Sequence, residues 1–249
     1  MKKETYIYGI WPAVEAIKSG KELDKIFLQN GLKGDGFREL FGLIKELEIP
    51  FQFVPIEKLN RLSRQNHQGV ISFVSEITYQ RIEDLVPFAF EQGRIPLFLI
   101  LDRVTDVRNV GSIARTAECA GVDGLIIPSR GSAQINSDAI KTSAGALYKL
   151  PVVRAQNVKE TILYLKNSGL TILAASEKTE KEYTQVDYNR PLAIIMGSEG
   201  EGISDEYLKL TDEELRIPLL GEIESLNVSV ASGVILFEAI RQRNINQHC

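Results

Sequence analysis

The sequence is poor in the residues that build metal centres, disulfide frameworks and membrane spans. Its 249 residues include two cysteines, Cys119 and Cys249, and two histidines, His67 and His248. With so few, we expect neither a disulfide framework nor a histidine-rich metal site, and no Ser-His-Asp hydrolase. The longest apolar runs, such as residues 97–101, fall far short of the roughly 20 residues that span a bilayer. These absences predict a cytoplasmic protein with no membrane segment and no metal.

Charge and size set broad limits on function. The net charge of -4 argues against strong non-specific attraction to nucleic acid, although local basic patches can still bind a folded RNA. A hydrophobic content of 44% over 249 residues is enough to bury the core of one large domain or of two modest ones. Composition therefore indicates an ordinary globular enzyme or binding protein.

The N-terminal part alternates short apolar runs with helical patterns, which predicts a small α/β domain over residues 1–78. Its predicted strands are residues 25–28, 51–54 and 70–74, and its predicted helices are residues 12–19, 37–48 and 56–63. Composition then shifts to charged and aromatic residues, so we predict a linker over residues 79–95 with a short helix over 82–90. A second domain is expected over residues 96–249.

Continuous apolar strands alternate with helices in this second domain, which predicts a parallel sheet covered on both faces. The predicted strands are residues 97–101, 124–127, 171–175, 192–196 and 215–219, and helices are expected to begin near residues 111, 137, 158 and 204. The last predicted helix covers residues 229–243. Its apolar residues at helical spacing would pack against the sheet or a second subunit, and they are Val230, Val234, Phe237 and Ile240.

Three short segments, residues 109–115, 196–202 and 226–233, combine small residues with polar ones. Small residues allow the backbone to approach a ligand closely, so the three loops could enclose one polar small molecule. In the first, Asn109 and Arg115 lie near a predicted helix N-terminus, where free N–H groups favour a phosphate. Alternatively, Asn109 caps the helix and Arg115 pairs with a surface carboxylate.

The other two segments follow predicted strands. The glycines around Glu199 do not follow the dinucleotide-binding order, and the chain has no P-loop lysine, which disfavours a nucleotide-binding α/β enzyme. Glu199 could equally be a solvated residue in a connecting turn. Asn227 and Ser229 fall at a predicted helix start, where capping alone would explain both.

Together, residues 97–243, including residues 141–147 between the first two segments, resemble the SpoU (TrmH) family of RNA ribose 2'-O-methyltransferases, a branch of the SPOUT class. The resemblance implies a trefoil knot, S-adenosylmethionine as cofactor and a homodimer. It maps Gly197, Ile217 and Leu226 to the cofactor pocket. It assigns activation of the ribose hydroxyl to Arg115, with orienting roles for Asn109, Glu199, Asn227 and Ser229. Because a guanidinium is hard to deprotonate, we expect Arg115 to dock phosphate and stabilise the oxyanion.

Residues 9–15 and 67–69 resemble the ribosomal-protein-like α/β substrate-binding extension of the rRNA-directed, RlmB-like subgroup. In this region Lys58, Arg61, Arg64 and His67 are expected to contact RNA. A solvated helix face explains the first three as well, and His67 could be structural.

The sequence thus predicts methyl transfer from S-adenosylmethionine to a ribose 2'-hydroxyl, by resemblance on a guanosine of large-subunit rRNA. Two alternatives stay open at this point. One is a tRNA ribose 2'-O-methyltransferase, which the same motifs allow. The other is a non-catalytic RNA-binding or ribosome assembly factor, which the complete set of polar motif residues disfavours.

Overall fold

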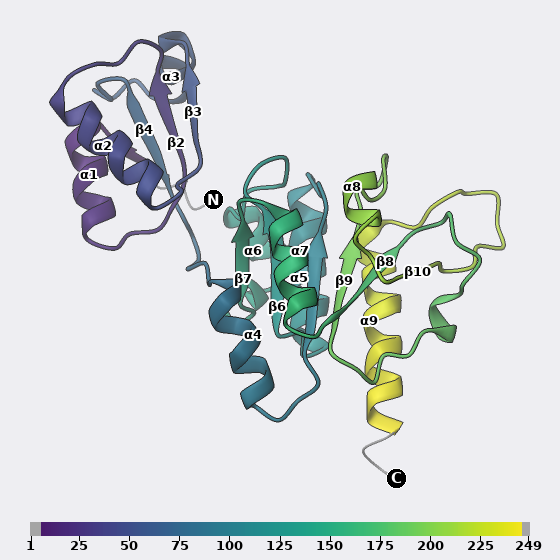
Figure 1. The fold of residues 1–249 in the computed structure, drawn as a ribbon. Helices are drawn as coiled ribbons and strands as arrows, with labels where there is room; N and C mark the ends of the chain where they lie inside the picture. The colour runs from purple at the N-terminus through teal and green to yellow at the C-terminus, as the bar shows by residue number, and fades with distance from the viewer. Residues whose placement is uncertain (1–5, 246–249) are drawn as a thin grey trace. The chain divides into compact units, whose positions relative to one another are not determined.

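The structure, a computed structural model, describes residues 6–245, the last by its backbone alone. His248 and Cys249 therefore lie outside the described residues. The chain forms two compact units (Figure 1). Unit 1 contains the described residues up to Thr78 together with the short segment Gln134–Ser137, and unit 2 contains Tyr79–Ala133 and the rest of the chain from Asp138. Each unit is described by itself below.

Unit 1 is built on a four-stranded mixed sheet with the strand order β1-β4-β2-β3. Strands β1 and β2 both pair antiparallel with β4, and β2 pairs parallel with β3. Its elements are β1 (Tyr6–Tyr8), α1 (Ile10–Lys18), β2 (Leu23–Gln29), α2 (Asp35–Glu46), β3 (Phe51–Val54), α3 (Ile56–Leu62) and β4 (Val70–Val74). The three predicted strands and three predicted helices of this region are confirmed, and β1 is an addition.

The two faces of this sheet are covered unequally. Helices α1 and α2 pack on one face of the sheet (Figure 1). Side chains alternate along β2, so that Ile26 and Leu28 point to that face. Phe27 points to the opposite face and packs with Leu59 of α3. Helix α3 has seven residues and is the one helix of unit 1 packed in this second cluster. Part of the second face is therefore not covered by a helix, and Gln134–Ser137 lies beside Phe73 there.

Unit 2 contains a six-stranded parallel sheet with the strand order β10-β8-β9-β5-β6-β7. Its strands are β5 (Leu97–Leu101), β6 (Gly124–Pro128), β7 (Val152–Ala155), β8 (Thr171–Ala175), β9 (Leu192–Met196) and β10 (Glu213–Leu215). Its helices are α4 (Ile82–Glu91), α5 (Val107–Cys119), α6 (Ser137–Thr142), η1 (Ala146–Tyr148), α7 (Val158–Asn167), η2 (Tyr183–Gln185), α8 (Asp205–Leu208) and α9 (Val228–Ile245).

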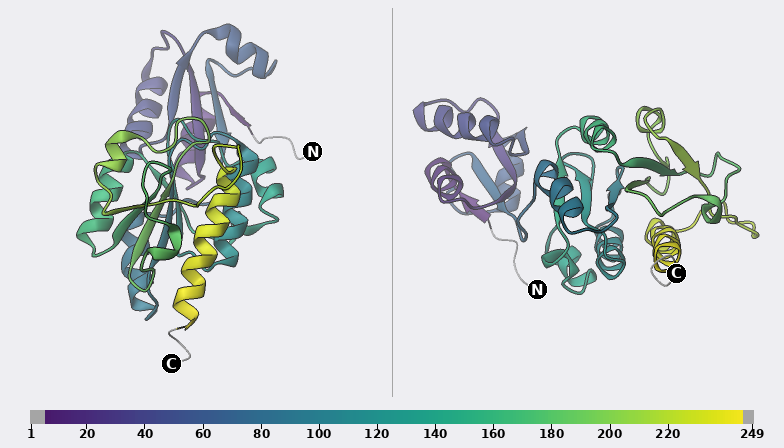
Figure 2. Two further views of the ribbon diagram at one scale, coloured as in Figure 1. Left: turned by 90° about the vertical axis from the view of Figure 1, so that its right-hand side faces the viewer. Right: turned by 60° about the horizontal axis from the view of Figure 1, so that its bottom comes forward.

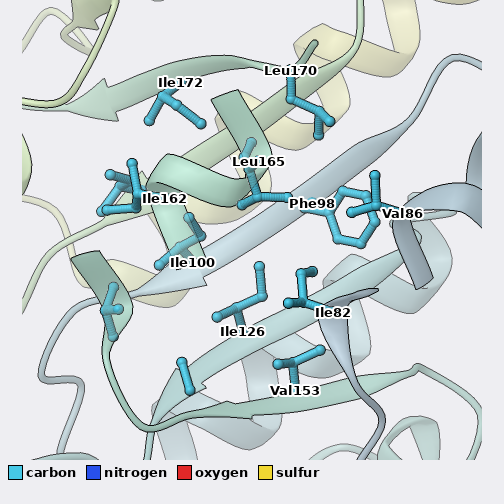
Figure 3. Close-up of a cluster of buried hydrophobic side chains, with 14 of the residues drawn as sticks. Ile82, Val86, Phe98, Ile100, Ile126, Val153, Ile162, Leu165, Leu170 and Ile172 are labelled. Atoms are coloured by element: carbon cyan, nitrogen blue, oxygen red, sulfur yellow. The ribbon is translucent and has the colours of Figure 1, made fainter. Parts of the chain in front are cut away.

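Both faces of the central strands are buried, as the continuous apolar runs predict. Every residue of β5 and β9 is buried. On one face, α4 and α7 cover the sheet, and Figure 3 shows Val86 of α4 and Leu165 of α7 beside Phe98 of β5. On the other side, α5 packs against α9, which Figure 2 draws in yellow. The predicted fold class, a parallel sheet between helices preceded by a small α/β unit, is confirmed.

The strand order creates a switch point in the middle of the sheet. From β5 the chain runs outward through β6 to β7, then crosses back to β8, and β9 inserts between β8 and β5. Chain direction around the sheet therefore reverses between β5 and β9, and ligands of open α/β sheets bind at the carboxyl ends of the strands at such a point. The loops after β5 and β9 begin with Asp102 and Gly197, so the first two polar segments share this edge.

Three local predictions need correction. The predicted strand over residues 215–219 is wrong, because β10 covers Glu213–Leu215, where it pairs with β8; Pro218 follows, and Leu220 is fully exposed. Helix α5 begins at Val107 rather than near residue 111, because Asp106 accepts a hydrogen bond from the backbone N–H of Arg108 and caps the helix. Strand β7 was not predicted, since its four residues include Arg154 and present no apolar run.

Two further findings concern classes of site. Among residues 6–245, no helix is both long and apolar enough to cross a membrane. The same residues hold no group of three or more His, Cys, Asp and Glu side chains that could bind a metal ion.

Candidate functional site

The three polar segments, far apart in sequence, meet at the carboxyl edge of the unit 2 sheet. Asn109 of α5 donates from Nδ2 to Oε1 of Glu199, which lies in the loop after β9, over 2.9 Å. Asn227, just before α9, donates from Nδ2 to Oδ1 of Asn109 over 3.0 Å and also to Oε1 of Glu199. Each side chain thus bonds to the other two. We call this set of Asn109, Glu199 and Asn227 the polar trio.

Asn227 also caps α9. Its Oδ1 accepts hydrogen bonds from the backbone N–H of Ser229 over 3.0 Å and of Val230 over 3.4 Å, and from the hydroxyl of Ser229. Two of the free N–H groups at the helix start are satisfied in this way. Capping, the simpler explanation for Asn227, is therefore correct but incomplete, because the amide of the same side chain holds Asn109 and Glu199.

The hydrogen bonds of the trio also fix the orientation of each side chain. Asn109 and Asn227 each use one amide end as a donor and the other as an acceptor, so their orientations follow from the hydrogen bonds. Glu199 accepts both of its bonds through Oε1, and within residues 6–245 its Oε2 makes no hydrogen bond. Glu199 is exposed but is held by two donors, so the interpretation as a merely solvated turn residue is wrong.

A cavity of about 370 Å³ lies on one side of the trio, within the size range of small-molecule sites. Gly197, Ile217 and Leu226, the three residues mapped to a cofactor pocket, all line it, together with Glu199. Its wall combines apolar side chains with backbone of the loops after β9 and β10, and it also includes Glu177. A ligand with an apolar ring, several hydrogen-bonding groups and a positive charge, such as S-adenosylmethionine, fits these surroundings.

A second cavity of about 410 Å³ lies on the other side of Glu199. It shares residues 198–201 and Val228 with the first cavity, and its own wall includes Asn109, Arg103 and Thr105. Glu199 therefore lies between two adjoining cavities. This arrangement allows a donor molecule in one cavity and an acceptor in the other to meet at a carboxylate that is already oriented.

Asp102, the residue after β5, accepts hydrogen bonds from Ser204 at the end of the loop that lies between the two cavities. Asp102 is 1% exposed, and its Oδ2 accepts a hydrogen bond from the backbone N–H of Ser204 over 2.6 Å and another from the Ser204 hydroxyl. Its Oδ1 accepts from Nε of Arg103 over 3.1 Å, and Arg103 in turn pairs with Glu201. Sequence analysis missed Asp102, although a carboxylate directly after a fully apolar strand was a usable signal.

Two glycines of the motifs, Gly197 and Gly111, pack tightly against backbone of the same chain. A Cβ atom added at Gly197 would lie 2.3 Å from the carbonyl carbon of Gly202, across the turn of the same loop. A Cβ atom at Gly111 would lie 2.7 Å from the backbone oxygen of Ala139 in α6. The expected close approach of backbone is therefore present, but at these two glycines the partner is backbone of this chain.

Arg115 stands apart from the trio. It lies about two turns into α5, not one, because the helix begins earlier than predicted. Its side chain is exposed, makes no hydrogen bond or ion pair within residues 6–245, and lines neither cavity. The alternative role, pairing with a surface carboxylate of the described chain, is therefore not observed. The structure brings together Asn109, Glu199, Asn227 and Ser229, but not Arg115.

The residues predicted to contact RNA lie in and after α3 of unit 1. Arg61 and Arg64 are exposed and make no ion pair within the described part of the chain. His67 is 6% exposed; its Nδ1 accepts from the backbone N–H of Gly69 over 3.1 Å, which leaves Nε2 to donate to Asn60 over 3.0 Å. Both ring nitrogens are thus occupied in shaping the turn before β4, and we leave His67 out of any RNA surface.

Comparison with known families agrees with this geometry. Residues 96–237 match the family model described as the SpoU rRNA Methylase family. Residues 6–80 match the model described as RNA 2'-O ribose methyltransferase substrate binding. The first match covers all three polar segments.

Full-length relatives carry the same assignment. The chain is 34% identical over 244 residues to a protein of Bacillus subtilis named as the TrmH family tRNA/rRNA methyltransferase YacO, covering 98% of each chain. It is 36% identical over 242 residues to a TrmH family tRNA/rRNA methyltransferase of Staphylococcus saprophyticus, covering 97% of each.

Solved structures show the same fold. The SpoU methyltransferase AviRb of Streptomyces viridochromogenes, crystallised with AdoMet, superposes with a TM-score of 0.61 at 24% identity, covering 97% of this chain and 91% of that one. The TrmH/SpoU tRNA modifying enzyme of A. aeolicus has a TM-score of 0.57 at 32% identity, covering 62% of this chain and 78% of that one. With its two family models, its relatives and its fold in agreement, the chain belongs to the SpoU (TrmH) family of RNA methyltransferases.

Proposed function

We propose that this protein methylates the 2'-hydroxyl of an RNA ribose, and that a guanosine of large-subunit rRNA is its substrate. Family membership establishes the coarser statement, an RNA methyltransferase that uses S-adenosylmethionine. The observation that supports transfer to a ribose hydroxyl is the polar trio between two adjoining cavities, because it supplies a donor site, an acceptor site and an oriented carboxylate where they meet.

When bound, S-adenosylmethionine supplies an electrophilic methyl group on a positively charged sulfur. Transfer would form a bond between the methyl carbon and the ribose 2'-oxygen as the S–CH₃ bond breaks, S-adenosylhomocysteine would leave, and the hydroxyl proton would pass to Oε2 of Glu199. Gly197, Ile217 and Leu226 would hold the cofactor in the first cavity, largely through backbone groups. Glu199 would accept a hydrogen bond from the ribose hydroxyl at Oε2, the oxygen that the trio leaves without a partner.

We assign Arg115 to phosphate docking and to stabilisation of the developing oxyanion, in a homodimer in which one subunit's Arg115 acts at the cofactor site of the other. Two features of the single chain support this arrangement. Arg115 lines neither cavity of its own chain. Helix α9, which packs against α5, exposes apolar side chains, with Val230 and Phe237 each 52% exposed. Such a stripe on a helix favours burial against a second copy.

The trefoil knot that the family resemblance implies is part of the same proposal. We place it at the connections that follow β9 and β10, which form most of the wall of the first cavity. Two observations support a fixed path for the first of these connections, namely the close packing of Gly197 on Gly202 and the hydrogen bonds from Ser204 to Asp102.

The preference for rRNA rests on the resemblance of the N-terminal residues to the rRNA-directed subgroup and on the name of the main family model. Transfer to tRNA ribose is the second candidate, because the Bacillus relative is named for both RNAs and the A. aeolicus neighbour for tRNA. With either substrate, we propose a cytoplasmic location.

The test is to compare rRNA and tRNA from cells with and without the gene by partial alkaline hydrolysis. A 2'-O-methyl group removes the nucleophile that cleaves its own linkage, so each methylated site appears as a gap in the ladder. We expect one gap in large-subunit rRNA that disappears in the deletion strain and returns on incubation with purified protein and S-adenosylmethionine. A gap that changes in tRNA alone selects the second candidate, and no change in either RNA refutes ribose methylation of these substrates.

A further inference from the structure

One face of the unit 1 sheet carries aromatic side chains on neighbouring strands. The pairing of β1, β4 and β2 aligns Tyr6, Phe73 and Lys25 in one row across the sheet, and Tyr8 and Phe27 lie in the next row, on either side of Ile71. These side chains point away from the face that α1 and α2 cover, because residues alternate between the two faces along each strand. The aromatic residues therefore form one continuous surface.

The rings on this surface support one another. Phe73 meets Tyr6 and Phe27 edge to face, with ring centroids 5.1 Å apart in both pairs. Phe27 is buried beneath α3, whereas Tyr6, Tyr8 and Phe73 are half-buried. The open part of the face thus presents rigid aromatic groups whose positions are set by the sheet.

Two lysines converge on the same ring. The Nζ atoms of Lys25 and Lys58 lie 4.5 Å and 4.7 Å from the centroid of Phe27. Neither ammonium group makes an ion pair within residues 6–245. Burial lowers the pKa of Lys25, and the neighbouring Lys58 lowers it further by repulsion. Two cations held close together without a counter-ion form a site that an anion would stabilise.

We propose that this surface, which we call the aromatic face (Tyr6, Tyr8, Lys25, Phe27, Lys58 and Phe73), binds an unpaired segment of the RNA substrate. Bases stack on the half-buried rings, and a backbone phosphate lies between Lys25 and Lys58. This inference deepens the proposed function, since it takes RNA as the substrate.

The chemistry of the aromatic face favours single-stranded RNA over a base-paired helix. Single-stranded RNA combines exposed base planes with a regularly charged backbone, and proteins bind it with aromatic side chains on a sheet and nearby cations. A base-paired helix hides its base planes, so it would contact the two lysines but not the rings. The exposed Arg61 and Arg64 make no cation–π contact within residues 6–245 and offer charge alone.

The test measures binding of the full-length protein to a fluorescent RNA hairpin with a loop of about ten nucleotides, a length within the range of single-strand binding sites. A fully paired duplex of the same size serves as the second probe. The variant Lys25→Gln/Lys58→Gln removes the two charges. The matched control Lys21→Gln/Lys33→Gln removes two exposed charges of the same unit that have no ring or ion-pair partner within the described residues. Tyr8→Leu removes one ring and keeps its apolar bulk.

We expect Lys25→Gln/Lys58→Gln to weaken hairpin binding about tenfold and to reduce the slope of log Kd against log salt by about 0.7, since the two lysines share one phosphate and each phosphate contact with a single strand contributes about 0.7. Tyr8→Leu should weaken hairpin binding about fivefold or more, as loss of one stacked base predicts, with no change for the duplex. Equal losses in the lysine variant and its control, or equal effects of Tyr8→Leu on hairpin and duplex, would overturn the proposal.

Calorimetric titration with S-adenosylmethionine on the same preparations separates this inference from the proposed function. The aromatic-face variants should bind the cofactor as the unmodified protein does. If the unmodified protein binds the hairpin through the aromatic face but transfers no methyl group to RNA, the reaction is refuted and the RNA surface stands. If transfer occurs and the variants bind the hairpin normally, the reaction stands and the surface is refuted.

Discussion

The two units use sheets for binding in different ways. In unit 2 the strands are parallel and buried on both faces, so polar side chains reach a ligand only from loops at the carboxyl edge. In unit 1 the sheet is mixed, and part of one face is open, so ring and ammonium groups project directly from the strands.

This difference determines how each site holds its geometry. The trio of unit 2 depends on hydrogen bonds between residues up to 118 positions apart in sequence, so a single lost donor disturbs residues from three separate segments. The aromatic face of unit 1 depends on strand register, and each side chain is positioned almost independently of the others. We therefore expect strongly coupled effects of mutation in unit 2 and nearly additive effects in unit 1.

The largest effect is expected from Arg115→Ala. Loss of the cation that stabilises the oxyanion should reduce methyl transfer about 100- to 1,000-fold, the cost of losing one such group in other enzymes. Binding of S-adenosylmethionine should be nearly unchanged, because Arg115 does not line the first cavity. Transfer of a tritiated methyl group to RNA and calorimetry measure the two quantities. Lys209→Ala, which removes another exposed cation of unit 2, is the control, and undiminished turnover in Arg115→Ala would remove this residue from the mechanism.

Asn227 allows its two roles to be separated. Asn227→Asp keeps the acceptor that caps α9 but replaces the amide donor by a carboxylate next to Glu199, so stability should be nearly normal while transfer falls about tenfold to 100-fold. Asn227→Ala should lose transfer to a similar extent and also about 1 kcal/mol of stability, the usual cost of a lost cap. Urea unfolding and the transfer assay give both values. Full activity in Asn227→Asp would show that the coupling within the trio has no catalytic consequence.

Asp102→Asn tests whether the hydrogen bonds between Asp102 and Ser204 fix the loop of residues 197–203. The charged hydrogen bonds of Asp102 to Ser204 are buried, so their loss should reduce the free energy of unfolding by about 2 kcal/mol. We also expect weaker binding of S-adenosylmethionine, because the loop of residues 197–203 lines the first cavity. Ser204→Ala removes the hydroxyl bond alone and should cost about 1 kcal/mol. If both variants bind the cofactor normally, Asp102 stabilises the fold without positioning the site.

The smallest effect concerns acid stability at the far edge of the sheet. Hydrogen bonds from Lys181, and then from Arg190, lower the pKa of Glu213 from its ordinary value of 4.5. Folding thus favours the ionised carboxylate. Its contribution to the free energy of unfolding is present above pH 4.5 and is lost as the pH falls below it. Glu213→Gln should cost about 1 kcal/mol at pH 7 and nothing at low pH. The measurement is thermal unfolding as a function of pH, with Glu214→Gln as the control. If this assignment is wrong, the stability difference between Glu213→Gln and the unmodified protein will be the same at all pH values.

Much of the fold was predictable because unit 2 buries its strands on both faces. Continuous apolar runs located β5, β8 and β9 at residues 97–101, 171–175 and 192–196, and the family and fold class are confirmed. Strands β1, β7 and β10 were missed or misplaced. Each has three or four residues and owes its conformation to pairing with a neighbour, which no local pattern encodes.

In the site, as in the fold, features that depend on the local sequence were predictable and tertiary contacts were not. Asn109, Glu199 and Asn227 could be chosen from their motifs, and the capping role of Asn227 follows from its position before a helix. The bonds that join the three loops are tertiary contacts, as is the burial of His67 by its own turn. Asp102 could have been chosen from its position after a fully apolar strand, but its partner Ser204 lies 102 residues away, so its role is a tertiary contact. The assigned roles of the site residues stay predictions.

The most direct test of the account is a calorimetric titration of the purified protein with S-adenosylmethionine, alongside Gly197→Ala. We predict saturable binding of one molecule per chain. The added methyl group, 2.3 Å from the carbonyl carbon of Gly202, should displace the loop and abolish or greatly weaken this binding. Absence of binding by the unmodified protein, or unchanged affinity in Gly197→Ala, would contradict the claim that the loops after β9 and β10 form the pocket for a methyl donor.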